Sequence, residues 1–274
     1  MDVIPGIARL GASDGRLFVV VGVFDGLHRG HHYLLTRLGR AAASHAAHPA
    51  VITFDAHPDE IVVGAAPPLL CDPDERLARL AAAGVAVTVV QHFDNALRMT
   101  EFDVFVERLR RRIGLAGFLM TPDAAFGHDR RGTPTALAEL GSRLCFEVVV
   151  VPPFRLDDGL VRSATVRQEV AGGRLDTARR LLGRSVAVTG ERAGDIMSFA
   201  VPVALPPDGS YDATVEPAWT PVGRVSEPQR ISVEVEDGVV RLRTRDSGRM
   251  ASRTLVTFSR RLPLSTKPDI LRRS

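Results

Sequence analysis

The sequence has few cysteines, no long apolar run and no excess of charge of one sign. Cys71 and Cys145 are the two cysteines among 274 residues, and neither belongs to a CxxC or Cys/His pattern, so no disulfide scaffold or zinc site is implied. No apolar run reaches the ~18 residues that a membrane span needs. The first ten residues also lack a basic segment followed by an apolar one. We therefore expect a cytoplasmic protein with no membrane partner.

Charge is nearly balanced along the chain. The 35 basic and 32 acidic residues leave a formal net charge of +3. Residues 108–112 hold the main internal cluster of cations, which is more typical of a solvated helix face than of a docking patch. Composition therefore predicts no nucleic-acid partner, and nothing in the sequence specifies an oligomeric state.

Apolar runs alternate with stretches of helical periodicity from about residue 17 to about residue 185. The runs LFVVVGV, AVITF, VAVTVV, GFLM and FEVVVV are predominantly apolar and do not alternate with polar residues, as is typical of strands buried on both faces of a parallel sheet. Asp72 before Pro73 predicts the start of a helix, and Gly84 its end. Two shorter helices are expected at residues 163–171 and 175–182. The pattern predicts an α/β fold with a Rossmann-like, doubly wound parallel sheet over residues 1–184.

The composition changes after Arg184. Strand-like runs separated by Gly, Pro and Asp follow, among them SVAVTG, SFAVPVAL, YDATVEP, RISVEVE, VVRLRT and TLVTFS. We expect residues 185–274 to form a small antiparallel β-barrel or meander, with a short helix or frayed tail over roughly the last ten residues.

The first apolar run leads directly into a glycine- and histidine-rich turn, GVFDGLHRGH, at residues 22–31. Ligands bind at the carboxyl ends of strands in open α/β sheets. Glycines allow a close approach of the backbone to phosphate, and the start of the next helix offers free N–H groups. His28 and His31 are three residues apart, so we expect both imidazoles to face one anion.

This arrangement suits attack of a substrate phosphate on the α-phosphorus of a nucleoside triphosphate. Fixed donors stabilise the charge that builds on the α-phosphate oxygens, and no nucleophilic side chain is required. We expect Mg²⁺ to bridge the triphosphate oxygens, and we assign no metal ligand to the protein. His32 is expected to lie on the helix surface.

GVFDGLHRGH resembles the FMN adenylyltransferase module of the bacterial bifunctional riboflavin kinase/FAD synthetase family, which belongs to the HxGH nucleotidyltransferases. The resemblance extends over residues 17 to about 185. TFDAHPDEIV at 53–62 is similar to the family's TFxPHP segment, DAAFGHDRRG at 123–132 to its DFRFGxxRxG loop, and RSATVR at 162–167 to its SSTxIR segment. The resemblance implies an FAD synthase that transfers AMP from ATP to FMN, with Mg²⁺ accompanying ATP.

The resemblance also implies roles for individual residues. His28, His31 and Arg167 match the catalytic positions. The implied ATP-binding residues are Gly22, Phe24, Asp25, Gly26, Gly30, Ser163 and Thr165, and the implied acceptor-binding residues are Phe54, His57, Pro58, Asp123, Phe126 and Gly127. Ser163 is also a candidate N-cap at a helix start suited to an anion. Without the resemblance, Ser163 would be a plain cap, Arg167 a solvated helix residue and His57 a loop histidine.

Several positions depart from the family pattern. Val23 replaces a common Asn, Ala124 and Ala125 replace the Phe and the basic residue of DFRFG, and Arg162 and Ala164 replace the first Ser and the Thr of SSTxIR. SFAVPV at 198–203 stands where the kinase signature GFPTAN belongs, so we expect a barrel without riboflavin kinase activity.

Three readings therefore remain open from the sequence. The first is an FAD synthase, and the second is a nucleotidyltransferase with another phosphorylated acceptor or with CTP. The third is a homologue that binds nucleotide or flavin without turnover. A dinucleotide-dependent dehydrogenase is disfavoured, because no GxGxxG follows the first apolar run.

Overall fold

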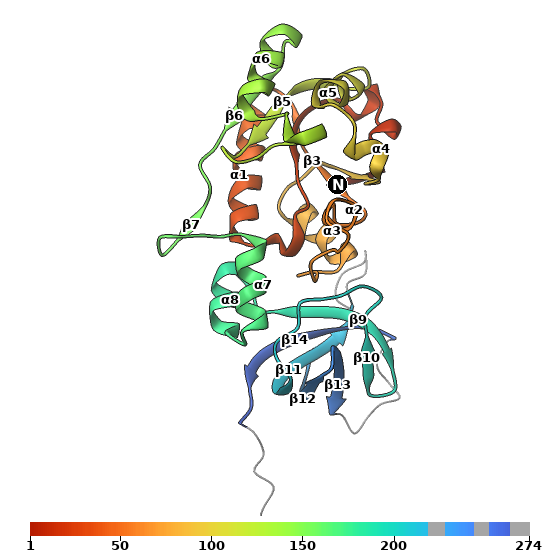
Figure 1. Cartoon of the computed structure of the whole chain (residues 1–274), viewed down its shortest axis with the longest axis vertical. Coiled ribbons are helices and arrows are strands. Elements are labelled where there is room, and N and C mark those ends of the chain that lie inside the picture. The colour runs from red at the N-terminus through yellow and green to blue at the C-terminus, as the bar shows by residue number, and fades with distance from the viewer. Residues whose placement is uncertain (219–227, 244–251, 264–274) are drawn as a thin grey trace, which may run out of the picture.

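A six-stranded parallel sheet occupies the first part of the chain (Figure 1). The computed structural model describes residues 1–218, 228–243 and 252–263. The strand order is β1-β4-β3-β2-β5-β6, and every neighbouring pair is parallel. The strands are β1 (Asp2–Pro5), β2 (Arg16–Val21), β3 (His48–Phe54), β4 (Val87–Gln91), β5 (Gly114–Met120) and β6 (Glu147–Val150).

Sequence analysis found β2 to β6 but missed β1. This edge strand is only four residues long, and of these only Ile4 is buried. A strand that short, exposed on most positions and ending in proline, lacks the apolar run that marked the others. The doubly wound parallel sheet itself is confirmed.

Helices cover both faces of the sheet. Leu17 and Val19 of β2 lie in one apolar cluster with side chains of α5 and α6, while Phe18 and Val20 lie in another with side chains of α1 and α3. Successive residues of a strand point to opposite faces, so a strand between two helical layers has to be apolar throughout. These helices are α1 (Arg29–Ser44), α3 (Pro73–Ala82), α5 (Phe102–Arg110) and α6 (Pro134–Leu144).

The predicted boundaries of α3 are confirmed. The Asp72 carboxylate accepts from the backbone N–H of Asp74 at 2.9 Å and Pro73 is the first helical residue. Gly84 follows the helix with φ of +83°, a left-handed conformation that glycine adopts at little cost. Shorter helices precede and follow, namely α2 (Asp59–Val62) and α4 (Asn95–Arg98).

The second part of the chain is a closed antiparallel barrel with the strand order β10-β13-β12-β11-β14-β9. SFAVPVAL is not a strand, contrary to expectation, because β10 ends at Ser198. Pro202 interrupts the segment and has no N–H to donate to a ladder. The expected carboxyl-terminal helix or tail lies outside the described residues. The strands are β9 (Ala187–Ala193), β10 (Ile196–Ser198), β11 (Gly209–Pro217), β12 (Gln229–Glu236), β13 (Val239–Arg243) and β14 (Arg253–Arg261).

Two helices, α7 (Ser163–Ala171) and α8 (Leu175–Leu182), lie between the sheet and the barrel (Figure 1). Their buried side chains share one apolar cluster with those of the barrel. The barrel is also tied to the sheet side of the molecule through Leu69, whose N–H donates to the Pro202 carbonyl at 2.9 Å and whose carbonyl accepts from Ala204 at 2.8 Å. The boundary after Arg184 stays a prediction, since the core runs across it.

In the described ranges, no helix combines the length and apolar character needed to cross a lipid bilayer.

Candidate active site

The loops that hold the predicted site leave adjacent strands at the point where the chain reverses direction across the sheet. From β2 the chain proceeds to β3 and β4, and it then returns to β5 on the other side of β2. Ligands of open α/β sheets bind in the crevice outside the strand ends at such a reversal. Residues 22–28 follow β2 and residues 121–133 follow β5, so the fold places two predicted motifs at this reversal.

The two motif histidines form a stacked pair at the start of α1. The ring centroids of His28 and His31 are 3.7 Å apart with an interplanar angle of 14°. His28 is 4% exposed, and its Nδ1 accepts a hydrogen bond from the His31 backbone N–H at 3.3 Å. A neutral His28 therefore carries its proton on Nε2, as a donor. The Nδ1 of His31 is buried and has no partner among the described residues.

Both imidazoles are neutral at pH 7. Burial, together with the nearby charges of His32 and Arg167, lowers the pKa of His28 to about 4. Burial also lowers the pKa of His31 well below its ordinary value. The pair is thus held uncharged, and the Nε2–H of His28 is a preorganised donor for a nearby anion.

The free energy of unfolding should decrease as the pH is lowered from about 6.5 to about 4, in part because of His28. The unfolded chain binds a proton at this imidazole near pH 6.5, and the folded chain does so only near pH 4. Between these values the unfolded state holds more protons, so stability rises with pH through this window. Urea unfolding midpoints measured from pH 4 to 7 should depend less steeply on pH in His28→Asn than in the wild type. Equal slopes in the two proteins would contradict this assignment.

Asp25 is buried, and its carboxylate is surrounded by donors from distant parts of the chain. It accepts from the N–H groups of Leu70 at 3.0 Å and Cys71 at 3.3 Å, and it forms an ion pair with Nη2 of Arg167 at 2.6 Å. Gly26 next to it has φ of +78°, and a Cβ there would lie 2.8 Å from the Leu70 side chain. The segment around Leu70 thus fixes the turn between β2 and α1.

Arg167 of α7 is held on two sides. Its Nε donates to the Pro68 carbonyl at 2.8 Å and its Nη2 to Asp25, while Nη1 has no hydrogen-bond partner within the described part of the chain.

Ser163 is not the N-cap of α7, contrary to expectation. Arg162, with an extended backbone, occupies the N-cap position without a capping hydrogen bond from its side chain. Ser163 is the first helical residue, and its hydroxyl donates to the Asp25 carbonyl at 3.1 Å.

Glycine at position 30 permits the close approach of α1 to the start of α7. A Cβ at Gly30 would lie 2.9 Å from the Val161 carbonyl oxygen and 3.1 Å from the His28 ring. Phe24, with φ of +55°, places its ring 5.0 Å from that of His31. Gly22 continues the end of β2 through its N–H to the Ile52 carbonyl at 3.0 Å. Thr165 lies half-buried two residues before Arg167.

The end of β3 contributes a second group of predicted residues. Phe54 and Phe93 meet edge to face at 5.2 Å between ring centroids. His57 accepts through Nδ1 from the N–H of Asp59 at 3.2 Å, and Pro58 precedes α2. Burial lowers the pKa of His57, and the charges of Arg167 and Asp25 also act on it. His57 is therefore within electrostatic range of Asp25 in the turn after β2 and of Arg167 in α7.

The loop after β5 divides its predicted residues between the surface and the core. Asp123 is exposed and pairs with Arg162 at 2.8 Å. Phe126 packs against Phe118 with ring centroids 5.7 Å apart, and Gly127 has φ of +77° with no room for a Cβ beside Phe102. Asp123 is thus the member of this set that faces solvent, while the other two shape the loop.

Two arginines that the sequence did not point to hold the site together, Arg76, which is buried, and Arg184, which is partly buried. Arg76 donates to the carbonyls of Val23 at 3.2 Å and Phe54 at 2.8 Å, which joins the ends of β2 and β3. Arg184 donates to the Gly26 carbonyl at 3.2 Å. Little in the sequence indicated either role. Arg76 is an arginine inside the expected helix that begins at Pro73, and Arg184 follows the end of α8.

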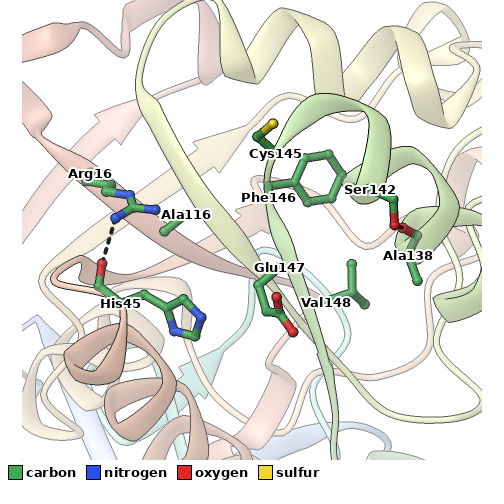
Figure 2. A pocket seen from close by; sticks show the side chains of 10 residues that line it. Arg16, His45, Ala116, Ala138, Ser142, Cys145, Phe146, Glu147 and Val148 are labelled. Carbon is green, nitrogen blue, oxygen red and sulfur yellow. Dashed lines mark hydrogen bonds between the residues drawn. The ribbon is translucent and has the colours of Figure 1, made fainter.

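A separate pocket of about 430 Å³ lies at the opposite edge of the sheet (Figure 2). Its lining includes Arg16 at the start of β2, Glu147 at the start of β6, and His45 and Cys145 at helix ends. Arg16 donates to the His45 carbonyl at 2.9 Å. Because His28 follows the carboxyl end of β2, this pocket is remote from the motif residues.

A solved structure shares the overall fold of this chain. The crystal structure titled as a macrolide-efflux protein from Streptococcus pneumoniae superposes with a TM-score of 0.79 at 22% identity, covering 98% of this chain and 93% of that one. At this identity the comparison concerns the fold alone, and it includes both the sheet and the barrel.

Sequence comparisons identify the family. Proteins named bifunctional riboflavin kinase/FMN adenylyltransferase are 29% identical over 191 residues in Pseudomonas fluorescens and 31% identical over 197 residues in Escherichia coli K12. Each alignment covers 69% of this chain, and the chain spans about three fifths of the relatives' lengths, 61% and 62% respectively. The sequence model of the family described as FAD synthetase matches residues 11–165, which is more than half of the chain. The chain therefore belongs to the FAD synthetase family.

Proposed function

We propose that this chain is an FAD synthase that transfers AMP from ATP to FMN and releases pyrophosphate. The observation that carries the proposal is the stacked, neutral pair of His28 and His31 at the start of α1, at the strand ends where the chain reverses across the sheet. Family membership supports the same reaction.

In the proposed reaction an oxygen of the FMN phosphate attacks the α-phosphorus of ATP. A new P–O bond forms as the bond to the β-phosphate oxygen breaks, and pyrophosphate leaves with that electron pair. His28 donates through Nε2–H to an α-phosphate oxygen as charge builds there, and the free N–H groups at the start of α1 add to this. No covalent intermediate with the protein forms.

Arg167 is proposed to bind the triphosphate. Asp25 and the Pro68 carbonyl hold its guanidinium in place, which leaves Nη1 to donate to a phosphate oxygen. We assign Ser163 and Thr165 to the same side of ATP. The described residues contain no group of three or more His, Cys, Asp or Glu side chains that could hold a metal ion, so we assign Mg²⁺ to the oxygens of ATP, as part of the substrate.

The acceptor is proposed to lie against Phe54, His57 and Pro58. The edge-to-face partner of Phe54, Phe93, extends this aromatic surface, which suits a flat ring system. Arg162, which stands at the position of the first Ser of the SSTxIR pattern, forms an ion pair with Asp123 at 2.8 Å. That pair favours, as a second candidate, transfer to a different phosphorylated acceptor.

We propose that the barrel has no riboflavin kinase activity. The segment that replaces the kinase signature, around Pro202, instead pairs with Leu69 through backbone hydrogen bonds. Leu70, the next residue, donates to Asp25. This arrangement supports a structural role, in which the barrel helps to hold the turn that contains Asp25.

The purified protein should form FAD from FMN and Mg·ATP, with one pyrophosphate per FAD, and should form neither FMN nor FAD from riboflavin. Chromatography of parallel reactions measures both. Pyrophosphate release only with another phosphorylated acceptor, or with CTP, would favour the second candidate. Tight binding of ATP and FMN without release would show a binding protein, and FMN formed from riboflavin would overturn the assignment of an inactive barrel.

A further inference from the structure

A second cavity lies against α1, on the side that faces away from the sheet. Its volume is about 360 Å³, and it is bounded by the first two turns of α1, by α3, by the connection after β6 and by the end of α8. Arg29, His32 and Tyr33 share this side of the helix, because residues three and four apart are neighbours on a helix surface. Leu35 and Leu38 face the sheet instead. The cavity is therefore separate from the crevice at the strand ends.

The cavity is lined by three arginines and a histidine. Arg29 and His32 come from α1, Arg79 from α3, and Arg184 from just beyond α8. None of the described residues that line it is acidic. Arg79 and Arg184 share one buried carboxylate, that of Glu75, at 2.7 Å and 3.5 Å. Because the Glu75 carboxylate is the counter-charge to Arg79 and Arg184, and Arg29 adds a third positive charge, the cavity has a net positive charge.

The guanidinium of Arg184 is only partly satisfied. Its Nη2 donates to the Gly26 carbonyl and to Glu75, but Nε and Nη1 are buried without a partner among the described residues. Burial and the charge of Arg79 lower the pKa of Arg184, and both arginines contribute to lowering the pKa of His32. Partly buried cations that repel one another are costly, and an anion in the cavity would offset that repulsion.

Aromatic side chains form another wall of the cavity. The rings of Tyr33 and Phe154 are 5.7 Å apart, and the Arg29 guanidinium lies 5.6 Å from the centroid of Phe154. The volume exceeds that of a phosphate ion, so a phosphate ester with a small apolar or aromatic group fits beside these rings.

We propose that this cavity is a second anion site, which binds a phosphate group through Arg29, Arg79 and Arg184. Guanidinium groups are suited to phosphate because their planar donors engage two oxygens at once. The inference concerns binding alone and does not rest on the proposed function. Arg184 also contacts Gly26 of the motif turn, so the site borders the proposed active site without containing His28.

Calorimetric titration of the full chain with inorganic phosphate, at constant ionic strength in sodium chloride, tests the proposal. The His28→Ala protein should still bind phosphate at one saturable site, which separates this cavity from the proposed triphosphate site. In that background Arg79→Gln should weaken phosphate binding at least about tenfold, the loss expected for one hydrogen bond to a charged group. Arg16→Gln, in the pocket at the opposite sheet edge, should leave it unchanged.

A second variant tests the proposal independently, in case Arg79→Gln does not fold. Thr36 lines the cavity from α1, and Thr36→Glu would supply a carboxylate of the protein's own. This variant should raise the thermal unfolding midpoint and abolish phosphate binding. No saturable binding in the His28→Ala protein, or binding unaffected by both cavity variants, would overturn the proposal.

Phenyl phosphate then distinguishes the sources of the phosphate group. Tighter binding than inorganic phosphate would support the site and identify an aromatic phosphate ester as the class it takes. Equal binding would support the site as one for free phosphate.

Discussion

Replacing His28 by alanine is expected to lower the rate of FAD formation from ATP and FMN by at least ~10²-fold, the typical loss when one preorganised transition-state donor is removed. His28 has a buried ring and a pKa of about 4, so near neutral pH it acts as an uncharged donor through Nε2. The loss should appear in kcat rather than in the KM for ATP, because the donor acts on charge that develops in the transition state.

His48→Ala serves as the matched control for this experiment. His48 is exposed at the amino-terminal end of β3, at the other edge of the sheet, and its replacement should leave kcat unchanged. Steady-state kinetics of the three proteins, with circular dichroism to verify folding, measure the effect. Turnover by His28→Ala within a few-fold of the wild type would place the active site elsewhere.

Replacing Asp25 by alanine is expected to destabilise the fold by about 3–5 kcal/mol, the range for removing one partner of a buried ion pair. Asp25 is 2% exposed and the Arg167 side chain 16%, so solvent compensates little for the lost charge. The N–H groups of Leu70 and Cys71 would also lose their acceptor. Urea unfolding at pH 7, measured through the shift of the midpoint, gives the magnitude.

Two further variants serve as controls for this prediction, Asp25→Asn as the conservative replacement and Glu107→Ala as the loss of an exposed ion pair. Asparagine keeps an oxygen acceptor for the backbone amides and removes only the charge, so it should destabilise less than alanine does. Glu107 pairs with Arg110 on an exposed helix surface, and its loss should barely move the midpoint. If Asp25→Ala and Glu107→Ala shifted the midpoint equally, the Asp25–Arg167 pair would not be a structural centre of the turn.

The elements that sequence reasoning found are those whose signal is local. The central strands are predominantly apolar because helices cover both faces, and α3 carries its own start and stop signals in Asp72, Pro73 and Gly84. The strand β1 and the true course of the segment around Pro202 were missed, because a short edge strand and a segment paired outside the barrel have no such pattern.

The candidate site divides in the same way. The stacking of His28 on His31 follows from their spacing at the start of a helix. The role of Ser163 as first helical residue rather than cap depended on the extended backbone of Arg162. Which of the predicted loop residues after β5 face solvent depended on tertiary packing, because Phe126 packs against Phe118 of β5 while Asp123 stays exposed.

The sequence by itself determined the α/β class, the positions of the motifs at strand ends, and the pairing of two histidines one helical turn apart, because each depends on residues close along the chain. Only the tertiary structure decided that Asp25 holds Arg167, 142 residues away, that Leu69 links the motif turn to the barrel, and that Arg184 lines a cavity beside α1. Contacts of this kind arise when separate elements pack together, and no local periodicity records which buried charge will meet which partner.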